Sequence, residues 1–374
     1  MEHVSYMMRA LELAAKGCGS TSPNPMVGSV IVNKNGEIVG EGYHQKAGTP
    51  HAEIHALNNA ESKANGSTIY VNLEPCSHYG RTPPCVNAIV NAGIKKVVIG
   101  MVDPNPKVAG RGIDYLKSKG IEVVSGVMEA EAKELNKAFV KFITTGKPYV
   151  TSKLAMSLDG KTATVTGESK WITSLMARQR VHQLRHQVDA ILVGINTVLL
   201  DDPSLTTRLP DQQGIDPIRI ILDSKLRIPL TSKVLNQESN ADTIIFTSGQ
   251  SSTAKIEQLK KIGIKVVESP GSTNGIDISW VMDWLGKNHI IHVLIEGGSE
   301  VNFSAIKANI VNEFWWFYAP KIIGGKNAPS GIGGAGFTTI PEALKLKNIS
   351  IETVGPDILV KGYPEKEEGT CLQD

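Results

Sequence analysis

One histidine, one glutamate and two cysteines constrain what this chain can fold into more than any other feature. His51 and Glu53 stand two positions apart, and eight residues separate Cys76 from Cys85. One imidazole and two thiolates are a typical zinc ligand set, and three protein ligands leave the fourth tetrahedral position for water. Zinc lowers the pKa of that water, and a nearby carboxylate can carry its proton to a departing amine. The pattern therefore predicts hydrolysis of an amine by one zinc ion per chain, with His51, Cys76 and Cys85 as ligands and Glu53 as the catalytic residue.

The residues around these positions support the same interpretation. Pro50 precedes His51 where a helix is expected to begin, and an apolar strand over residues 68–73 leads toward Cys76. Cys85 falls in the first turn of an expected helix, where the helix dipole favours the thiolate that zinc requires. A lone His-x-Glu is usually a solvated helix face, and a buried cysteine often acts as a small hydrophobic residue. The complete set is much less expected by chance.

Two other functions fit part of the pattern. One is a nucleic-acid adenosine or cytidine deaminase with an unrelated second domain. The net charge of +2 and the aromatic content of 5% argue against a nucleic-acid partner. The other is a structural zinc ion that holds a binding module together, which requires a fourth ligand. His78 is the candidate for that ligand, and His55, four residues after His51, could be mistaken for one.

The length of 374 residues suggests two or three domains. Asn35-Gly36 lies between two apolar segments and is a strong signal for a β-hairpin. Strands and helices are mixed over residues 1–145, which indicates a three-layer α/β/α sandwich. Residues 144–148 are expected to form a short linker. The expected strands are 27–33, 37–41, 68–73, 95–101 and 121–125, and the expected helices are 1–16, 86–90, 112–119 and 128–143, with one more that begins near His51.

A second α/β unit follows, over residues 149–364. The last expected strand is followed by Gly297-Gly298 and then by a helix. Small residues at such a strand-to-helix turn let backbone amides approach a phosphate. Since no G-x-G-x-x-G motif follows a first strand, an ordinary Rossmann fingerprint is absent, and a nucleotide-binding domain of another kind is expected. The expected strands are 149–156, 190–193, 218–223, 243–247, 265–268 and 292–295, and the expected helices are 174–187, 253–261, 278–287 and 300–308.

Cysteine use and hydropathy bear on where the protein works. Two of the four cysteines, Cys18 and Cys371, lie outside the proposed site and show no pairing pattern. In a chain of this size with no export signal, reduced thiols are expected. The amphipathic N-terminal segment lacks a long apolar core, and no later stretch reaches membrane-spanning length. The sequence predicts a cytoplasmic protein without membrane partners.

Several short segments carry a resemblance to a known family. In the first half they are TSPNPMVG at 21–28, HAE at 51–53, EPC at 74–76 and TPPCV at 82–86. In the second half they are KLAMSLDG at 153–160, GESKWIT at 167–173, DDPSLT at 201–206, LDS at 222–224 and EGG at 296–298. Along nearly its whole length the chain resembles the bifunctional deaminase/reductase of bacterial riboflavin biosynthesis. The eight-residue gap between the cysteines fits this family better than nucleoside or tRNA deaminases, whose cysteines usually stand two apart.

The resemblance implies a fold and two reactions. The fold is a cytidine-deaminase-like α/β/α sandwich over residues 1–145, followed by a dihydrofolate-reductase-like α/β domain over residues 149–364. The first domain would deaminate 2,5-diamino-6-ribosylamino-4(3H)-pyrimidinone 5′-phosphate with the help of Zn²⁺. The second would reduce the ribosyl side chain to ribityl with NADPH. The implied partners are phosphorylated pyrimidines and further copies of the chain in a homo-oligomer, not nucleic acid.

The resemblance also implies the binding residues of both sites. In the deaminase, Asn24 and His44 would bind the pyrimidine or the ribose phosphate, with Arg81 and Asn105 as weaker candidates. The alternative for each of the four is a local turn or capping role. Arg227, with Ser224, is a candidate to bind near the 2′-phosphate of NADPH. The implied cofactor residues are Ala155, Trp171, Thr197, Asp201, Ser224, Gly297, Gly298 and Ser299. The implied reductase substrate residues are Lys153, Ser169, Arg185, Leu205, Arg208 and Glu296. The alternative is that Trp171 is a core or lid residue and that Asp201 caps a helix.

Overall fold

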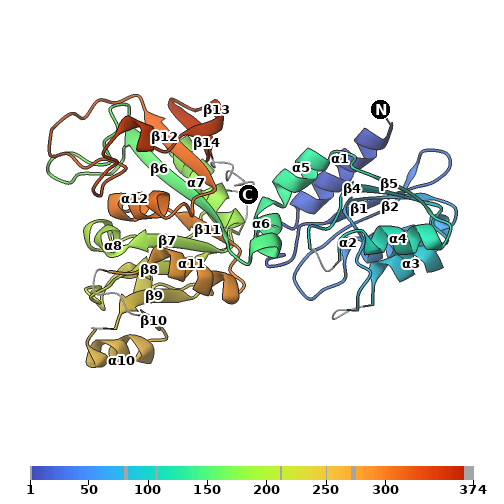
Figure 1. Cartoon of the computed structure of the whole chain (residues 1–374), viewed down its shortest axis with the longest axis horizontal. Helices are drawn as coiled ribbons and strands as arrows, with labels where there is room; N and C mark the ends of the chain where they lie inside the picture. The colour runs from blue at the N-terminus through green and yellow to red at the C-terminus, as the bar shows by residue number, and fades with distance from the viewer. Residues whose placement is uncertain are drawn as a thin grey trace, which may run out of the picture. The chain divides into compact units, whose positions relative to one another are not determined.

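The computed structural model of the chain describes residues 2–79, 83–105, 108–210, 213–249, 251–270 and 275–365. The chain divides into two compact units, Met1–Lys147 and Pro148–Asp374, and each unit is described by itself (Figure 1). Among the described residues, no helix is both long enough and apolar enough to cross a membrane.

The first unit contains a five-stranded mixed sheet with the strand order β2-β1-β3-β4-β5. β1 pairs antiparallel with β2 and β3, whereas β3, β4 and β5 are parallel. The hairpin predicted at Asn35-Gly36 is confirmed as the β1–β2 connection, where the side chain of Asn33 accepts hydrogen bonds from the N–H groups of Asn35 and Glu37. The strands are β1 (Gly28–Val32), β2 (Ile38–Tyr43), β3 (Thr68–Leu73), β4 (Lys96–Met101) and β5 (Glu122–Ser125).

Helices cover both faces of this sheet, as Figure 1 shows. Because side chains alternate along a strand, Val30 and Tyr70 pack on the face that α1 covers, while their neighbours Ile31 and Ile69 pack beneath α2 and α3. The predicted α/β/α sandwich is therefore confirmed. One face carries α1 (Glu2–Ala15) and α5 (Glu129–Leu135), and the other carries α2 (Ala52–Ala60), the 3₁₀ helix η1 (Glu61–Ala64), α3 (Cys85–Asn91) and α4 (Arg111–Ser118).

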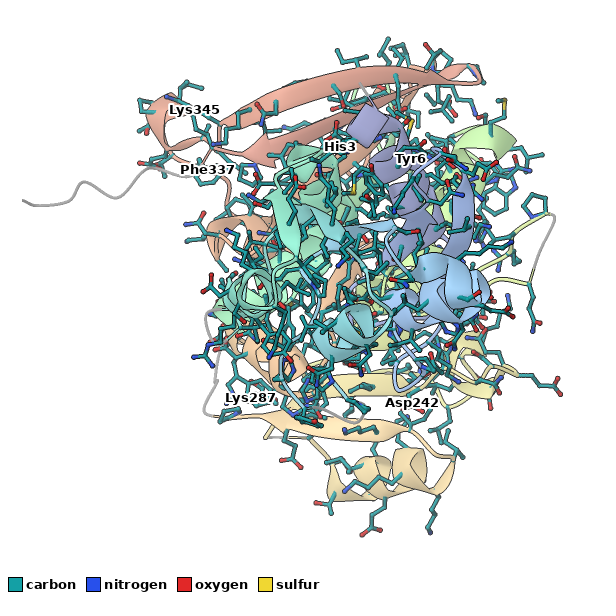
Figure 2. All side chains as sticks on the ribbon, turned by 90° about the vertical axis from the view of Figure 1, so that its right-hand side faces the viewer. His3, Tyr6, Asp242, Lys287, Phe337 and Lys345 are labelled. Carbon is teal, nitrogen blue, oxygen red and sulfur yellow. The ribbon has the colours of Figure 1, made fainter. Side chains whose placement is uncertain are left out.

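Aromatic contacts hold α1 to the middle of the sheet. Figure 2 labels His3 and Tyr6, which both lie on α1. The ring nitrogen Nδ1 of His3 lies 2.9 Å from the hydroxyl oxygen of Tyr70, and the rings of Tyr6 and Tyr70 are 5.1 Å apart between centroids. Since Tyr70 is buried in β3, these contacts fix the helix to a central strand.

α2 lies directly against β2 because β2 has glycine at two positions. A Cβ atom at Gly40 would lie 2.3 Å from the carbonyl oxygen of Ala56, and one at Gly42 would lie 2.5 Å from that of Ala52. No side chain fits at such distances, so the glycines allow the helix backbone to approach the strand. This close packing fixes the start of α2, where His51 and Glu53 lie.

The single helix predicted over residues 128–143 is wrong, because the structure divides it at Asn136. α5 ends at Leu135, and α6 (Lys137–Thr145) follows. The side-chain amide of Asn136 accepts a hydrogen bond from the N–H of Met26 and donates one to the carbonyl oxygen of the same residue. These bonds to a distant backbone segment offset the loss of helical continuity.

The connection between the units is shorter than the predicted linker over residues 144–148. α6 continues through Thr145, and Gly146 ends it with a φ of +70°. Glycine is the usual residue for this left-handed helix end. Only Lys147 and Pro148 then precede β6 (Tyr149–Ser157).

The second unit contains a nine-stranded sheet with the order β10-β9-β8-β7-β11-β6-β12-β14-β13. The first seven strands of this order are parallel, and β14 and β13 are antiparallel additions at one edge. The carboxyl ends of the parallel strands therefore share one edge of the sheet. The other strands are β7 (Ala190–Gly194), β8 (Ile218–Leu222), β9 (Thr243–Ser248), β10 (Lys265–Ser269), β11 (His292–Ile295), β12 (Glu313–Ala319), β13 (Leu346–Val354) and β14 (Asp357–Pro364).

Helices cover both faces of the second sheet as well. Val181 of α7 and Leu259 of α10 pack on one face, and Leu285 of α11 and Ile306 of α12 pack on the other. The predicted two-domain α/β architecture is confirmed. The helices are α7 (Leu175–Gln187), α8 (Ile195–Asp201), α9 (Lys233–Asn236), α10 (Thr253–Lys261), α11 (Ile278–Lys287), α12 (Ser299–Lys307) and the 3₁₀ helix η2 (Ile340–Glu342).

Six elements of the second unit were absent from the sequence prediction: α8, α9, η2, β12, β13 and β14. α8 and α9 span 7 and 4 residues, too few for a helical hydrophobic period to be recognised. β13 is mostly exposed and shows no alternation of buried and exposed residues. β12 is an aromatic run, Glu313–Ala319, and such short apolar runs do not distinguish a buried strand from a helix segment.

Candidate active sites

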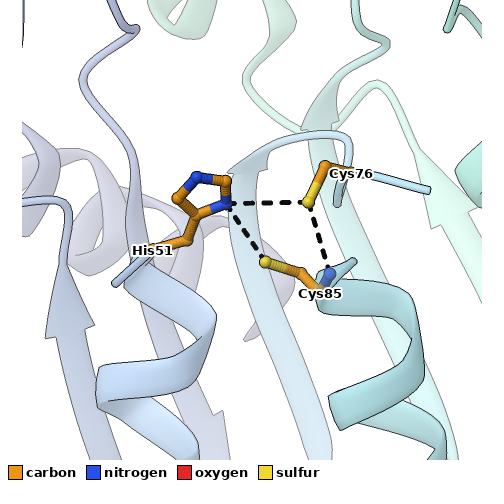
Figure 3. A group of neighbouring side chains, drawn as sticks. All are labelled: His51, Cys76 and Cys85. Carbon is orange, nitrogen blue, oxygen red and sulfur yellow. Dashed lines mark hydrogen bonds between the residues drawn. The ribbon is translucent and has the colours of Figure 1, made fainter. Parts of the chain in front are cut away.

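The structure brings His51, Cys76 and Cys85 together in the first unit (Figure 3). His51 is the N-cap residue of α2, Cys76 follows β3, and Cys85 is the first residue of α3. The Nδ1 atom of His51 lies 3.2 Å from the Sγ of Cys85 and 3.6 Å from the Sγ of Cys76. The strand and the two helix starts thus present three soft ligand atoms to one point.

The spacing of these atoms fits a zinc ion. All three ligand atoms lie within 4.8 Å of one another. Nitrogen and sulfur ligands bound tetrahedrally at about 2.0–2.3 Å from zinc lie about 3.5–3.8 Å from each other. The measured nitrogen–sulfur distances are close to that edge length.

The two sulfur atoms also have the electrostatics of a cation site. Hydrogen bonding from Cys85, through both its thiol and its backbone N–H, holds the pKa of Cys76 at about 4. The hydrogen bond to Cys76, with burial, raises the pKa of Cys85 well above its usual range. Two adjacent thiolates repel each other, and a divalent cation between them removes that repulsion.

Within the described part of the chain, the cluster has three ligands and no fourth. His78 is exposed and lies outside the cluster, and so does His55. A structural zinc site is normally closed by four protein ligands, whereas a catalytic site keeps one position open. The arrangement is therefore that of a catalytic site.

Glu53 lies in the first turn of α2 and is 3% exposed. Burial raises its pKa. Its side chain lines a cavity of about 480 Å³ together with His51 and Cys76, two of the predicted ligands. A carboxyl group beside the open metal position can accept and return a proton without being a ligand.

Asn24 and His44, two of the predicted substrate residues, lie on the wall of the same cavity. The Nδ2 atom of Asn24 is 3.2 Å from the Nε2 atom of His44, and the His44 ring meets the His51 ring edge-on with centroids 5.5 Å apart. Burial lowers the pKa of His44, so its ring is neutral near pH 7. Asn105 also lines the cavity, and Arg81 lies outside the described residues.

Asn72 and Asn136 support this wall, and sequence reasoning missed both. Each donates a hydrogen bond from its side-chain amide to the carbonyl oxygen of Met26. Asn72 also accepts a hydrogen bond from the N–H of Gly28. The backbone on one side of Asn24 is thereby held by two buried amides. No local pattern marks these residues, because their partners lie 46 and 110 positions away.

Glu74 is a further residue that sequence reasoning assigned no role. It is 3% exposed, and its carboxylate accepts hydrogen bonds from four backbone N–H groups. One of these groups belongs to Asp103, which lines the cavity, and two belong to Gly112 and Ile113 in the first turn of α4. A carboxylate at a helix N-terminus is stabilised by the helix dipole. The donors are the N–H groups of Asp103, Gly110, Gly112 and Ile113.

The second unit has a cavity of about 760 Å³ near the carboxyl ends of β6, β7 and β11. Most of the residues predicted for the reductase site lie on its wall. Ser224 and the turn of Gly297, Gly298 and Ser299 do not belong to the described lining of this cavity. The predicted residues that line it are Lys153, Ala155, Ser169, Trp171, Arg185, Thr197, Asp201, Leu205, Arg208 and Glu296.

Glu296 holds two cations at the base of this cavity. Its carboxylate oxygens lie 2.9 Å from the Nζ of Lys153 and 2.8 Å from the Nε of Arg185. All three side chains are at least 87% buried, since their exposed fractions are 13% or less. Burial alone would raise the pKa of Glu296, but Arg185 and Lys153 more than offset it and hold the pKa at about 2. Lys153 is therefore held inside the cavity by its ion pair with Glu296.

This ion-pair cluster makes the stability of the second unit dependent on pH. The folded-state pKa of Glu296 is lowered from 4.5 to about 2, so its contribution is present above pH 4.5 and is lost as the pH falls toward 2. A shift of this size corresponds to a free energy of unfolding on the order of 3 kcal/mol. We expect wild type to be more stable than Glu296→Gln near neutral pH, and this difference to shrink below pH 4.5. Urea denaturation of both proteins across this range checks it, and a constant difference contradicts it.

The predicted phosphate-binding turn follows β11. Gly297 and Gly298 have φ values of +144° and +83°, which strongly favour glycine. A Cβ atom at Gly297 would lie 3.1 Å from the Oγ1 of Thr197, so the turn lies against the start of α8. The side chain of Asn302 donates a hydrogen bond to the carbonyl oxygen of Gly298, which connects the turn to α12.

Ser224 follows β8, at the same edge of the sheet. Its carbonyl oxygen accepts hydrogen bonds from the hydroxyl groups of Thr247, Ser248 and Ser251. Arg227 donates a hydrogen bond to the side chain of Asn196 on α8. Ser224 thus stands with Thr197 and the glycine turn at the ends of parallel strands, where nucleotides bind in open α/β sheets.

Trp171 and Asp201 form one rim of the second cavity. Trp171 is 62% exposed, so the alternative that it is a core residue is wrong. The guanidinium group of Arg178 lies 4.4 Å from the centroid of its ring. Asp201 accepts a hydrogen bond from the hydroxyl of Ser169 and lies at the end of α8, where it caps no helix start.

Leu205 lies on the wall of the second cavity. Its side chain is 4% exposed and belongs to the hydrophobic core beneath α7. It has a φ of +55°, an uncommon value for a leucine.

The comparisons with known proteins cover both units. Residues 1–101 match the family model for the cytidine and deoxycytidylate deaminase zinc-binding region, and residues 148–360 match the RibD C-terminal domain. The riboflavin biosynthesis protein RibD of Actinobacillus pleuropneumoniae is 48% identical over 360 residues, which are 96% of this chain and 95% of that protein. The chain belongs to the RibD family. The resemblance read from the sequence motifs is thereby confirmed.

Solved RibD structures have the same architecture over their full length. The first form of Acinetobacter baumannii RibD has a TM-score of 0.88 at 39% identity and covers 98% of this chain and 99% of its own. The deaminase/reductase of Thermotoga maritima has a TM-score of 0.84 at 38% identity, and the match covers 97% of this chain and 99% of that one. This RibD-family chain is a bifunctional deaminase/reductase of riboflavin biosynthesis, and its cofactors are those of the two joined domains, zinc and NADPH. Both alternative functions, a nucleic-acid deaminase and a non-enzymatic zinc module, are excluded.

Proposed function

We propose that the chain deaminates 2,5-diamino-6-ribosylamino-4(3H)-pyrimidinone 5′-phosphate in its first domain and reduces the ribosyl side chain of the product in its second. The three-ligand cluster of the first unit carries this proposal, because it occurs in a chain that matches RibD proteins over 96% of its length. The Thermotoga maritima relative is named for these two activities. We assign the deaminase to residues 1–145 and the reductase to residues 149–364.

In the deaminase, His51, Cys76 and Cys85 would hold the zinc ion. Zinc at this position supplies Lewis acidity, which makes a water molecule more acidic. Glu53 accepts a proton from the attacking water and gives it to the ring. It then accepts a second proton, from the hydroxyl group added to the ring, and gives it to the amino group, which leaves as ammonia. Its burial in the cavity wall supports this role, since few water molecules compete for its carboxylate.

Asn24 and His44 would bind the pyrimidine substrate beside Glu53. Their side chains lie together on the cavity wall. The Nδ1 atom of the neutral His44 ring donates to the carbonyl oxygen of Pro50, so its Nε2 atom is an acceptor. The hydrogen bonds from Asn72 and Asn136 to the carbonyl oxygen of Met26 support this role, because they limit the movement of the backbone near Asn24.

In the reductase, NADPH supplies the hydride, which is delivered to C1′ of the sugar. The protein positions cofactor and substrate. Lys153, paired with Glu296, contacts the ribose where charge changes during reduction. Arg185 and Arg208 bind the substrate phosphate through charge-assisted hydrogen bonds, with Ser169, Leu205 and Glu296 as further substrate contacts.

The remaining residues of the reductase site would bind NADPH. Their positions along the carboxyl edge of the parallel strands support this assignment, because that edge is where open α/β sheets bind dinucleotides. The proposed cofactor residues are Ala155, Trp171, Thr197, Asp201, Ser224, Gly297, Gly298 and Ser299.

We further propose a cytoplasmic homo-oligomer whose small-molecule partners are phosphorylated pyrimidines. The edge strand β13 supports self-association, because Ile349 and Ile351 are 48% and 71% exposed on it. Exposed apolar side chains on an edge strand favour pairing with another chain.

Incubation with the diamino pyrimidine phosphate tests the proposed function directly. Without NADPH, the expected products are ammonia and the deaminated ribosyl compound. With NADPH, the expected product is the ribityl compound, with one equivalent of NADPH consumed. Mass spectrometry identifies the products of both incubations, and an unchanged substrate in both contradicts the proposal.

The phosphate contact gives a separate prediction for Arg208. Its guanidinium group is exposed on the cavity wall and donates a hydrogen bond to the hydroxyl of Thr206. We expect Arg208→Ala to raise the KM for the phosphorylated pyrimidine about tenfold or more and to leave the KM for NADPH nearly unchanged. On the dephosphorylated compound, wild type and variant should perform alike. An equal loss on both compounds would indicate a folding role instead.

A further inference from the structure

We infer that His182 is a further substrate-binding residue of the reductase site, whose Nε2 atom donates a hydrogen bond to an oxygen atom of the phosphorylated sugar. This inference rests on the proposed function, since it adds a contact to the same substrate. His182 lies on α7, three positions before Arg185, and its side chain lines the second cavity.

One nitrogen of the His182 ring is already in use. Its Nδ1 atom accepts a hydrogen bond from the backbone N–H of Arg208 at 3.2 Å. A ring nitrogen that accepts a hydrogen bond carries no proton, so the single proton of a neutral imidazole is on Nε2. The Arg208 backbone thus selects the tautomer, and Nε2 is left as a donor on a ring that lines the cavity.

The surroundings keep this ring neutral. Burial, followed by the positive charges of Arg185 and Arg208, lowers the pKa of His182 to about 4, against an opposing effect of Glu296. Lys153 also acts to lower it. A neutral donor adds a directed contact without adding another positive charge to a crowded cluster of cations.

The ligand atom that this donor fits is an oxygen. Arg185 and Arg208, its neighbours in the cavity, are suited to phosphate because their guanidinium groups can bind two oxygens at once. A phosphorylated sugar offers acceptors of two kinds at this place, phosphate oxygens and hydroxyl oxygens. Both accept from an imidazole N–H, so the shared chemistry is an oxygen acceptor next to the arginines.

His186, one helical turn further along α7, provides a matched control. Its Nδ1 atom accepts a hydrogen bond from the backbone N–H of Ile215, also at 3.2 Å, and burial lowers its pKa. His186 thus makes the same kind of bond to the backbone as His182. Among the described residues that line the cavity, however, His182 is present and His186 is not.

Asparagine and glutamine separate the two functions of the His182 ring. Asparagine has an oxygen near the Nδ1 position and can keep the bond to the Arg208 backbone, but it has no donor near Nε2. Glutamine has an amide nitrogen near Nε2 and can keep the donor. We expect His182→Asn to lower kcat/KM for the deaminated pyrimidine phosphate about ten- to a hundredfold, as loss of a hydrogen bond to a charged or polar oxygen predicts. His182→Gln should stay near wild type, and both should leave the KM for NADPH unchanged.

The experiment measures NADPH oxidation by the full chain with the deaminated compound, in wild type and in Asn and Gln variants at both histidines. His186→Asn and His186→Gln should behave like wild type. The dephosphorylated compound then identifies the acceptor: the wild-type advantage over His182→Asn disappears if the donor binds phosphate and persists if it binds a sugar hydroxyl. Thermal melting of each variant verifies that it is folded.

Three results would overturn the inference. They are a His182→Asn protein as active as wild type, a His182→Gln protein as impaired as His182→Asn, and an equal rise in the KM for NADPH. The wild-type control keeps this question separate from the proposed function. If wild type itself fails to oxidise NADPH with the deaminated compound, the proposed function is wrong, whereas normal wild-type turnover with an unimpaired His182→Asn variant contradicts only the role of His182.

Discussion

Replacing Cys85 by serine is expected to remove the zinc ion and the deaminase activity together. Cys85 supplies one of three ligand atoms at the start of α3, and a neutral hydroxyl group is a far weaker zinc ligand than a thiolate. Wild type should carry about one zinc ion per chain at neutral pH, and Cys85→Ser should carry almost none. Elemental analysis of the purified proteins measures this directly.

The controls for this prediction lie in the same chain. Cys18 is a free cysteine outside the cluster, so Cys18→Ser should keep both zinc and deaminase activity. The reductase of the Cys85→Ser protein should still oxidise NADPH when the deaminated compound is supplied, because its site lies in the other unit. A Cys85→Ser protein that deaminates normally would contradict the zinc assignment.

Replacing Glu53 by glutamine is expected to abolish deamination while the metal stays in place. The amide has nearly the same shape as the carboxyl group but cannot accept the proton of water. General acid–base catalysis contributes about a hundredfold to ten-thousandfold, so the deamination rate should fall by at least that much. Zinc content and melting temperature should remain near the wild-type values, since Glu53 is not one of the three ligands.

The same variant tests the order of the two reactions. Supplied with the deaminated compound, Glu53→Gln should reduce it at the wild-type rate. Supplied with the diamino compound and NADPH, it should stop before any NADPH is consumed. Rapid oxidation of NADPH from the diamino compound would show that reduction does not require prior deamination, and the proposed order would be wrong.

Local sequence patterns were sufficient for the elements that surround the metal ligands. β3 coincides with the apolar run at residues 68–73, and Cys85 begins α3 directly after Pro84. The Asn35-Gly36 hairpin was equally predictable, because Gly36, with a φ of +81°, suits the left-handed position of a short hairpin loop. Each of these features is determined by neighbours in the sequence.

The features that were missed depend on partners far away in the sequence. Asn136 divides a predicted helix because its side chain binds Met26, 110 positions earlier. An asparagine inside a helix is only mildly unfavourable, so nothing local marks the break. Glu74 and His182 are similar cases, since each binds backbone N–H groups 26 or more positions away. Such roles become visible only once the chain is folded.

The break at Asn136 limits how far the deaminase can be treated as a transferable module. Residues 1–101 match the zinc-binding region and contain Glu53 and all three predicted ligands. Phe139 and Ile143 of α6 nevertheless line the same cavity, and Asn136 holds the backbone beside Asn24. A fragment cut after the matched region would keep every reactive group and lose part of the pocket that receives the substrate. We therefore expect the smallest autonomous deaminase to extend to the end of α6 at Thr145, which two residues separate from the second unit.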